Sequence, residues 1–284
     1  MTWRDDFERV VGETIISAER VTGGSINHAY RVTLDNGDPV FVKTHPSPPS
    51  GMFDDEAEDL RLLGQANLGN ELLVPGVFGS DESFLALTWL DLDSAFSDED
   101  FGRGLAHTHA MEQHSVRSHP FFGGRDNFLA TLPQQGYCLS IAELYCEHRL
   151  RPVLQRLEPS TLNKQLREKI DKLRARPELF GPVEKPAFLH GDLWSGNVSG
   201  YKGKPVIFDP ACYWGHREID LAMLQLFGSI SSRFVDAYSE VWPLDKAWRE
   251  RTSLWQLYPI AVHAILFGGG YVRQLLSTFD DVLA

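Results

Sequence analysis

The residues of this chain whose types and spacing suggest chemistry lie between positions 189 and 209. Their order is Leu189-His190-Gly191-Asp192-Leu193-Trp194-Ser195-Gly196-Asn197, followed by Val206-Ile207-Phe208-Asp209. A carboxylate in the position of Asp192 can accept or orient a hydroxyl proton. The amide oxygen of Asn197 and the carboxylate of Asp209 are groups that hold Mg²⁺ against a triphosphate. The pattern therefore predicts transfer of a phosphoryl group to a hydroxyl.

The spacing is that of the kinase catalytic loop, H-x-D-L-x-x-x-N, with the metal-binding aspartate after the next strand. We interpret Asp192 as the catalytic residue and Asn197 and Asp209 as metal ligands. The alternative is a β-hairpin whose polar groups only cap its turns, and the composite spacing argues against it. If the interpretation is correct, other parts of the chain must bind the nucleotide.

A glycine-rich stretch near the N-terminus is the first candidate for that role. Alternating apolar residues predict strands at 15–21, 30–34 and 39–43. The stretch Gly23-Gly24-Ser25-Ile26-Asn27 would then join two antiparallel strands. It is therefore neither a Walker loop nor a dinucleotide fingerprint, both of which lead into a helix. Because glycine lacks Cβ, backbone N–H groups of such a loop can approach phosphates, although a Gly-Gly pair alone is more often a plain turn.

Lys43 and an acidic partner are the second candidate. Lys43 ends the predicted third strand, where its ammonium could pair with the α- and β-phosphates. A helix is predicted over 54–63, and its apolar stripe consists of Phe53, Ala57, Leu60 and Leu63. Glu56 lies on this stripe, and an acid on a buried face needs a cation. We therefore choose Glu56 over Glu58 or Asp55 as the partner of Lys43.

The segment 83–90 reads as the last strand of a first lobe, and the chain becomes helical after about residue 91. We predict an N-terminal nucleotide-binding lobe over 1–90 and a C-terminal catalytic and substrate-binding lobe over 91–284. In a kinase, backbone groups near Thr88, Trp89 and Leu90 would face the adenine edge. An ordinary edge strand followed by a loop would have the same sequence, so both interpretations stay open.

The region after Asp209 bears on the size of the substrate. A protein kinase would insert a long activation segment ending in Ala-Pro-Glu here, and this chain has neither. The acceptor is therefore predicted to be small, or a small adduct on a larger molecule. Asp220, at the start of an apolar helix, is interpreted as a cap or a brace for the catalytic loop rather than a catalytic group. The histidines at 107, 109, 114 and 119 lack a firm ligand pattern, so we do not assign them a metal.

Composition narrows the classes of partner. With a net charge of −12, the 284-residue chain is a poor candidate for binding nucleic acid, which needs clustered Lys and Arg. Its apolar runs are too short for a membrane span, and its polar N-terminus is unlike a signal peptide. Cys138, Cys146 and Cys212 show no metal-ligand spacing. We expect buried or free thiols in a reducing cytoplasm. We also expect the protein to be a monomer.

The chain resembles the fructosamine kinase (ketosamine-3-kinase) family, within the wider aminoglycoside-phosphotransferase and protein-kinase-like group. The resemblance covers nearly the whole chain and is carried by the stretches at 22–30, 189–197, 208–223 and 266–271, with further matches at 126–127, 133–134 and 149–152. It implies an α+β fold of two lobes, an antiparallel-sheet lobe and a mainly helical one. It also implies ATP-dependent, Mg²⁺-dependent phosphorylation of the sugar 3-hydroxyl of a ketosamine, after which the phosphorylated adduct decomposes and frees the amine.

By this resemblance Asp192 is the catalytic base, Asn197 and Asp209 bind Mg²⁺, and Lys43 with Glu56 holds the phosphates. Ser25 departs from relatives that carry Cys in the glycine-rich loop, which puts thiol-based regulation in doubt. Trp194 offers a flat apolar surface beside Asp192, suited to a sugar face or an attached amine, although it could equally pack the lobes together. A kinase for an aminoglycoside or amino alcohol is the nearest alternative, and a nucleotide-binding pseudokinase scaffold is a second. The preferred ketosamine is not predicted.

Overall fold

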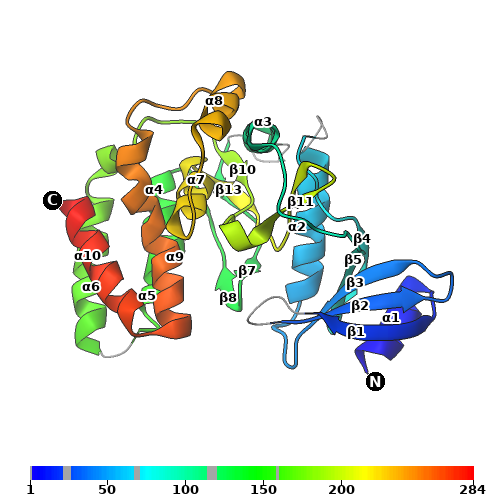
Figure 1. Ribbon diagram of the computed structural model, residues 1–284. Coiled ribbons are helices and arrows are strands. Elements are labelled where there is room, and N and C mark those ends of the chain that lie inside the picture. The colour runs from blue at the N-terminus through cyan, green and yellow to red at the C-terminus, as the bar shows by residue number, and fades with distance from the viewer. Residues whose placement is uncertain (1, 22–26, 67–70, 114–119, 158–159) are drawn as a thin grey trace.

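The computed structural model describes residues 2–284 except 22–26, 67–70, 114–119 and 158–159. Figure 1 shows two parts: a twisted sheet with its helices at the right, and a larger, mainly helical part at the left. The sheet is antiparallel in the order β1-β2-β3-β5-β4. Its strands are β1 (Ile15–Val21), β2 (His28–Leu34), β3 (Pro39–Thr44), β4 (Val77–Asp81) and β5 (Phe84–Thr88). The three strands predicted at 15–21, 30–34 and 39–43 are thus present.

Side-chain alternation along the strands creates two apolar faces in this N-terminal lobe. Helix α1 (Trp3–Val11) covers one face, where Phe7 packs against the inward residues of β2 and β3. Helix α2 (Met52–Ala66) covers the other with Phe53, Ala57 and Leu60, which contact β5. The helix predicted at 54–63 is therefore present and longer at both ends. In Figure 1, α2 stands between the sheet and the helical part, so the face of α2 turned away from the sheet can contact the C-terminal lobe.

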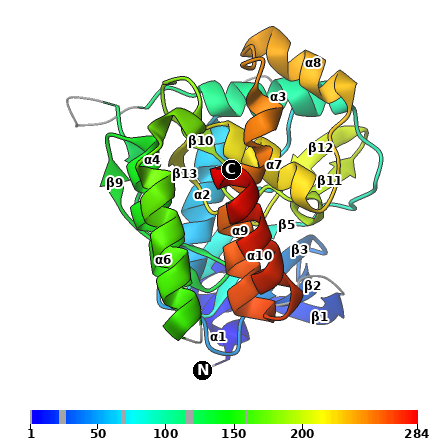
Figure 2. The same cartoon turned by 90° about the vertical axis from the view of Figure 1, so that its left-hand side faces the viewer.

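The C-terminal lobe is built mainly of packed helices. They are α3 (Asp98–Ala110), α4 (Ile141–Glu143), α5 (Arg151–Leu154), α6 (Ser160–Arg174), α7 (Glu218–Leu226), α8 (Ser232–Val241), α9 (Thr252–Phe267) and α10 (Gly270–Leu283). A wide-turned π-helix, η1 (Leu144–Leu150), joins α4 to α5, and short 3-10 turns are η2 (Pro177–Phe180), η3 (Ser195–Asn197) and η4 (Trp248–Arg251). Figure 2 shows α6, α9 and α10 lying side by side. Along the described part of the chain, no helix combines the length and the apolar character needed to cross a bilayer.

Short strands carry the predicted catalytic stretch. A four-stranded sheet in the order β10-β13-β6-β9 contains β10 (Ala187–Leu189), β13 (Tyr213–Gly215), β6 (Phe122–Gly123) and β9 (Tyr137–Cys138). Two hairpins are β7 (Asn127–Leu129) with β8 (Leu132–Gln134) and β11 (Val198–Tyr201) with β12 (Lys204–Ile207). The stretch His190–Asn197 connects β10 to β11, and Asp209 follows β12. The β11–β12 hairpin also bridges to Leu73 and Asp93, close to the change of lobe. The exact lobe boundary at residue 90 stays a prediction.

Candidate active site

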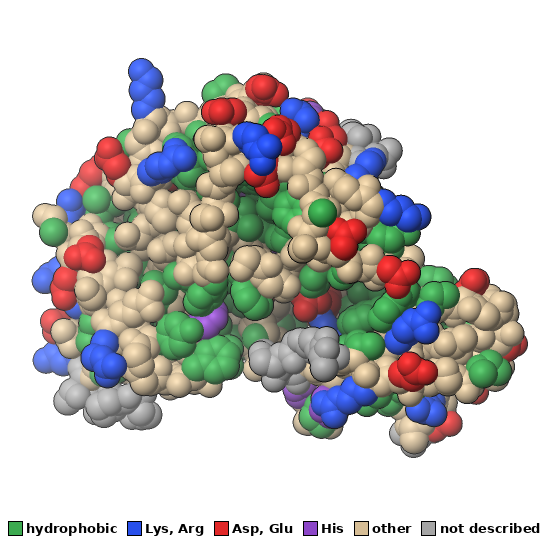
Figure 3. Space-filling view, viewed as in Figure 1, with side chains coloured by type: hydrophobic (Ala, Val, Ile, Leu, Met, Phe, Trp, Pro, Cys, Tyr) green, Lys and Arg blue, Asp and Glu red, His purple; other side chains and the backbone are tan. Residues whose placement is uncertain are grey.

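A cavity of about 850 Å³ lies between the two lobes. Figure 3 shows the hollow, in which acidic and basic side chains lie among hydrophobic ones. The cavity brings together most of the residues predicted from the sequence, namely Asn27, Lys43, Glu56, Thr88, Trp89, Leu90, Asp192, Trp194, Asn197 and Asp209. The predicted loop residues Gly23, Gly24, Ser25 and Ile26 lie outside the described residues. A volume of this size and lining by both lobes suit a nucleotide with a small acceptor.

Lys43 is buried between two acids. Its Nζ donates to Glu56 Oε1 and Oε2 at 2.7 and 2.9 Å, so the predicted Lys43–Glu56 pair is present. It also donates to Asp209 Oδ1 at 2.9 Å, a contact that the sequence did not predict. Burial opposes the ammonium charge, but Asp209 and Glu56 outweigh burial and raise the pKa of Lys43. Lys43 thus stays a cation and links the helix of one lobe to the predicted metal ligand of the other.

The turn before Asp192 depends on Gly191. This residue has φ +83°, and a Cβ there would lie 2.0 Å from the carbonyl oxygen of Ala211. Any larger residue would therefore push apart the catalytic loop and the segment after Asp209. The His190 carbonyl accepts the Ala211 N–H at 2.9 Å, which holds the two segments in contact.

Asp220 stabilises the same turn through hydrogen bonds to its backbone. Its carboxylate accepts the backbone N–H of His190 at 2.8 Å and that of Gly191 at 3.0 Å. It also contacts His109 Nε2 at 3.1 Å, and His109 Nδ1 lies 2.7 Å from the hydroxyl of Tyr238. The side chains of Asp220, His109 and Tyr238 are buried, and a buried carboxylate is stable only when its oxygens are hydrogen-bonded. The interpretation of Asp220 as a brace for the catalytic loop is confirmed; the N-cap position of α7 is Arg217 instead.

Replacing Asp220 by Asn is expected to lower stability and turnover together. The amide nitrogen would face backbone N–H donors, leaving buried donors unpaired at a cost of about 1–3 kcal/mol. Thermal unfolding and kcat check this prediction, with Asp236→Asn on the exposed side of α8 as the control. An unchanged melting temperature would contradict the bracing role.

His190 orients the backbone of the loop rather than the substrate. Its ring is fully buried, and Nδ1 receives the Asp192 N–H at 3.3 Å while Nε2 lies 3.1 Å from the Phe208 carbonyl. Nδ1 therefore accepts and Nε2–H donates, which describes a neutral imidazole. Burial lowers the pKa of His190, in agreement with that state.

Asp192 has the environment of a general base that works near neutral pH. Burial, and next the charge of Asp209, raise its pKa to about 7, while a hydrogen bond from Asn197 opposes the shift. A carboxylate with such a pKa is a stronger proton acceptor than an ordinary aspartate and is still ionised in half or more of the molecules above neutrality.

Asn197 and Asp209 provide oxygen donors suited to Mg²⁺. The amide nitrogen of Asn197 donates to the Asp192 carbonyl at 2.9 Å, which leaves its Oδ1 as a possible ligand atom. Asp209 has φ +57°, the left-handed region that non-glycine residues rarely adopt, and such strain concentrates at functional sites. Carboxylate and amide oxygens are the ligands that Mg²⁺ takes in proteins. The residues present therefore fit the expected metal.

Some hydrogen-bonding groups of the segment predicted to face adenine, Thr88 to Leu90, are already engaged within the protein. The Thr88 N–H and hydroxyl both bond the Gly76 carbonyl, at 2.8 and 3.3 Å, so these donors are already in use. The Trp89 indole N–H donates to Asp91 at 2.8 Å. Contact with the adenine edge would therefore fall to the main chain of Trp89 and Leu90.

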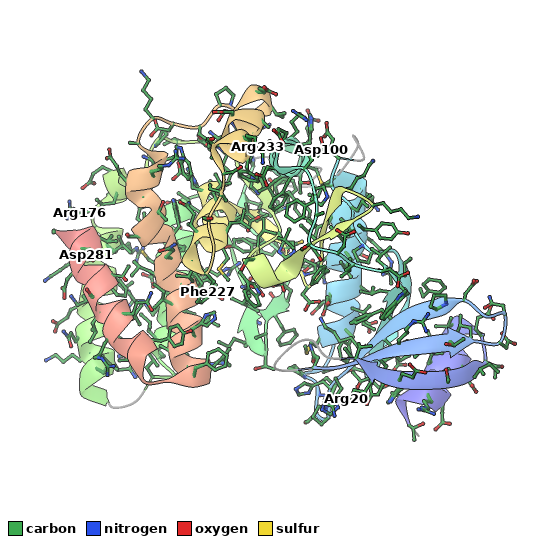
Figure 4. All side chains as sticks on the ribbon, viewed as in Figure 1. Arg20, Asp100, Arg176, Phe227, Arg233 and Asp281 are labelled. Atoms are coloured by element: carbon green, nitrogen blue, oxygen red, sulfur yellow. The ribbon has the colours of Figure 1, made fainter. Side chains whose placement is uncertain are left out.

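Trp194 lies at the mouth of the cavity and is 38% exposed. A Cβ at Gly196 would lie 2.2 Å from the Trp194 ring, so the ring folds closely over that glycine. Its other neighbour is Phe227, with ring centroids 6.0 Å apart, and Phe227 in turn lies 4.9 Å from His263. Figure 4 places Phe227 just beyond the lower end of α7. Aromatic rings thus extend from the catalytic loop across the C-terminal lobe, and the indole keeps a free surface.

The structure adds a group of residues that sequence reasoning missed. Asp59 of α2 is buried beside Arg125, Asn127 and Cys212. Burial raises the pKa of Asp59 to about 6, although Arg125 opposes this. The available signal was that Asp59 follows Glu56 by three residues and so shares the buried face of the helix. Two of its partners, Arg125 and Asn127, lie in the stretch 121–128, and the third, Cys212, follows Asp209.

The histidine group has no common metal site in the described part of the chain. His109 is engaged with Asp220 and Tyr238, and His107 Nε2 lies 3.7 Å from Glu71. His114 and His119 lie outside the described residues. That these histidines do not hold a metal stays a prediction.

Comparison with known proteins decides the family. The fructosamine kinase family model matches residues 4–284. The chain belongs to the fructosamine kinase family. Among its relatives is the probable ketoamine kinase of Vibrio cholerae, 32% identical over 277 residues that cover 95% of this chain and 93% of that protein. The chloroplastic protein-ribulosamine 3-kinase of Oryza sativa subsp. japonica is also 32% identical, covering 95% of this chain and 79% of that protein.

Solved structures confirm the protein-kinase-like two-lobed fold. A candidate fructosamine-3-kinase from Thermobifida fusca superposes with a TM-score of 0.85 and 36% identity, covering 99% of this chain and 98% of that one. A macrolide 2'-phosphotransferase from Brachybacterium faecium is 14% identical and superposes with a TM-score of 0.60. The match covers 99% of this chain and 96% of the phosphotransferase. The second likeness supports the fold alone. The fold and family inferred from the sequence are both confirmed.

Proposed function

We propose that the chain is an ATP-dependent ketosamine kinase that phosphorylates the sugar 3-hydroxyl of a fructosamine or ribulosamine. The observation that carries the proposal is the meeting of Lys43, Asp192, Asn197 and Asp209 in one cavity between the lobes. Membership of the fructosamine kinase family supports the acceptor class. Relatives named as ketoamine kinase and protein-ribulosamine 3-kinase support the same class. Phosphorylation of the 3-hydroxyl would destabilise the adduct and release the amine, a repair of glycation.

Each residue has a distinct part in the proposed transfer. Lys43, positioned by Glu56, binds the α- and β-phosphates. Asp192 accepts a hydrogen bond from the acceptor hydroxyl, orients its oxygen toward the γ-phosphate and takes its proton. Asn197 and Asp209 would hold Mg²⁺, which neutralises charge on the phosphates when bound. The neutral His190 and the carboxylate of Asp220 keep the Asp192 turn in place.

The two acidic partners of Lys43 differ in their proposed roles. In this structure it bonds both Glu56 and Asp209. Asp209 would also hold Mg²⁺, whereas Glu56 has no second proposed role and reaches Lys43 through both oxygens. Glu56 is therefore the partner proposed to direct the ammonium toward the phosphates.

A substrate panel tests the proposal. ATP consumption would be measured with fructosyl-lysine and ribulosyl-lysine, and the product would be located by ³¹P and ¹³C NMR. An aminoglycoside, choline and ethanolamine serve as other hydroxyl acceptors. Phosphorylation at the sugar C3 oxygen supports the proposal. Turnover only with one of the other acceptors would overturn it in favour of a different small-molecule kinase, and nucleotide binding without any transfer would indicate a pseudokinase.

Trp194 is proposed to stack on the sugar or its attached amine. Trp194→Ala is expected to raise KM for the ketosamine about tenfold, because an aromatic contact contributes about 1 kcal/mol or more. KM for ATP should change little if the indole contacts the acceptor, as proposed. Trp194→Phe, which keeps a flat ring, is the matched control and should stay closer to wild type. Equal losses for both substrates would indicate lobe packing instead.

The pH profile should report Asp192. As pH falls through about 7, Asp192 takes up a proton and can no longer accept one from the acceptor, so kcat/KM should fall tenfold per pH unit. The measurement is kcat/KM for ATP between pH 5 and 8.5, which reports groups of the free enzyme. A flat profile down to pH 5 would remove Asp192 as the base.

The proposed partners are ATP, Mg²⁺ and a small or protein-bound ketosamine, with no nucleic acid or membrane. We propose that the chain works in the cytoplasm, which the three buried free thiols Cys138, Cys146 and Cys212 support. We also propose that it acts as a monomer, since both the predicted nucleotide-binding and catalytic residues belong to one chain.

A further inference from the structure

Asp59 is a buried acid that the proposed mechanism does not use. It lies on α2 three residues after Glu56 and is 1% exposed. Its Oδ1 accepts from Arg125 Nη2 at 2.7 Å. Its Oδ2 accepts from Asn127 Nδ2 at 3.1 Å and from the Cys212 N–H at 2.8 Å. An acid is retained in such a place only when several donors satisfy it, and here all three donors come from the C-terminal lobe.

The same partners contact one another and the neighbouring turn of α2. Arg125 also bonds the carboxylate and the carbonyl oxygen of Asp55. Asn127 Nδ2 donates to the Cys212 carbonyl at 2.9 Å. One turn of α2 is thereby joined to the loop around Arg125 and to the backbone at Cys212. We call Asp59, Arg125 and Asn127 the α2 anchor.

The α2 anchor and the Cys212 backbone that it contacts lie beside the two acids that hold Lys43. Asp59 is one helical turn after Glu56, and Cys212 is three residues after Asp209. The hydrogen bond between Asp59 and the Cys212 N–H therefore sets how far α2 lies from the Asp209 segment. Lys43 spans that same gap, with bonds of 2.7 and 2.9 Å to Glu56 and Asp209. Besides the anchor and Lys43, the only polar link that the described residues show between these two backbones is a long contact of 3.9 Å from the Cys212 thiol to the Asp59 carbonyl.

We propose that the α2 anchor positions Glu56 relative to Asp209 and thereby places Lys43 for nucleotide binding. The three anchor residues are positioning residues in this proposal, since their hydrogen bonds go to one another, to Asp55 and to Cys212, and they act through Glu56. This inference rests on the proposed nucleotide role of Lys43. It does not depend on which hydroxyl compound is the acceptor.

A double-mutant cycle between Asp59 and Glu56 tests the proposal. Titration with Mg²⁺ and a non-hydrolysable ATP analogue gives affinities that need no acceptor. Asp59→Ala is expected to weaken this affinity about five- to tenfold, because two residues that act as a unit couple strongly. In a Glu56→Gln background the same change should add less than about twofold. Multiplicative effects of the two changes would overturn the proposal.

Hydrogen exchange separates positioning from general loss of stability. Asp59→Ala should speed amide exchange in α2 while exchange in β1 and β2 stays unchanged, and Asp59→Asn, which keeps an acceptor for Cys212, should lie between Asp59→Ala and wild type. Unchanged exchange in α2 would also overturn the proposal, even if the nucleotide analogue failed to bind.

The matched control is Glu184→Gln. It removes the acid from a partly buried ion pair with Arg217 in the C-terminal lobe, where both guanidinium contacts are 2.7 Å. It should lower the melting temperature yet leave nucleotide affinity within about twofold of wild type. A loss of affinity as large as that of Asp59→Ala would show that stability alone explains the effect. Failure of the proposed function would give a different result, namely no phosphorylation of ketosamines by the wild-type protein.

Discussion

Asp192→Asn is expected to lower kcat by about a thousandfold while nucleotide affinity changes little. The amide keeps the size of the carboxylate and can still accept the hydrogen bond from Asn197, which reaches Asp192 Oδ2 at 3.3 Å. It cannot take a proton from the acceptor hydroxyl. The remaining site would hold both substrates without a base. Steady-state kinetics with the best ketosamine of the panel and titration of the nucleotide analogue check both parts.

The same variant should be more stable than wild type at alkaline pH. The pKa of Asp192 rises from 3.8 to about 7 in the folded protein, so the folded state binds the proton more tightly than the unfolded chain. Stability conferred by that proton is complete below about pH 4 and is lost as pH rises through about 7. Removing the group should stabilise the fold by about 1–2 kcal/mol at pH 8, after allowance for its partial contact with solvent. At pH 5 the gain should be smaller.

Asp236→Asn is the control for both measurements, since it makes the same chemical change on the exposed side of α8. It should alter neither kcat nor the pH dependence of unfolding. An Asp192→Asn enzyme with more than about a tenth of wild-type kcat would remove Asp192 from the role of base. Loss of activity together with lower stability at pH 8 would indicate a structural role for the carboxylate.

The sequence was sufficient for features set by local pattern. Alternation of apolar residues along the segments of β1 to β3 predicted the sheet, because successive side chains of a strand point to opposite faces. Glu56 could be chosen over its acidic neighbours because it lies on the apolar stripe of α2, and the bond to Lys43 is present. The brace formed by Asp220 could also be foreseen, since an acid in an apolar helix needs donors.

Features that depend on distant segments could not be predicted in the same way. Lys43 and Asp209 are 166 residues apart, and no periodicity in either segment reports their contact. Arg125 and Asn127 lie in a stretch whose strands have two or three residues, too short for a period of two to be seen. Their bonds to Asp59 depend on how the two lobes meet. The one local signal for these bonds is the position of Asp59 on the buried face of α2 beside Glu56, where an acid needs donors.

Lys43→Met is expected to reduce kcat/KM for ATP at least a hundredfold and to destabilise the fold. The methionine fills most of the space of the lysine stem but removes the cation between two acids. Glu56 would remain buried without its partner, and breaking a buried ion pair on one side costs about 3–5 kcal/mol. Steady-state kinetics with varied ATP and denaturant unfolding measure the two effects. Lys43→Arg, which keeps a charge in a different geometry, tests whether charge alone is enough.

The loss of stability in Lys43→Met should depend on pH in a way that identifies Glu56. Burial already raises the pKa of Glu56 to about 7 even though Lys43 opposes the shift, so removal of Lys43 raises it further. The unpaired acid then takes up a proton in the folded state, and the variant loses less stability at pH 5 than at pH 8. Equal losses at both pH values would show that Glu56 is not the group left uncompensated.

Adding Glu56→Gln to Lys43→Met separates stability from chemistry. The double variant buries a neutral amide where the unpaired acid was, so it should recover much of the lost stability at pH 8. It should not recover kcat/KM for ATP, because no cation is left to bind the phosphates. Recovery of activity along with stability would mean that Lys43 only balances the charge of Glu56. Recovery of stability alone would assign Lys43 to the nucleotide and Glu56 to holding it there.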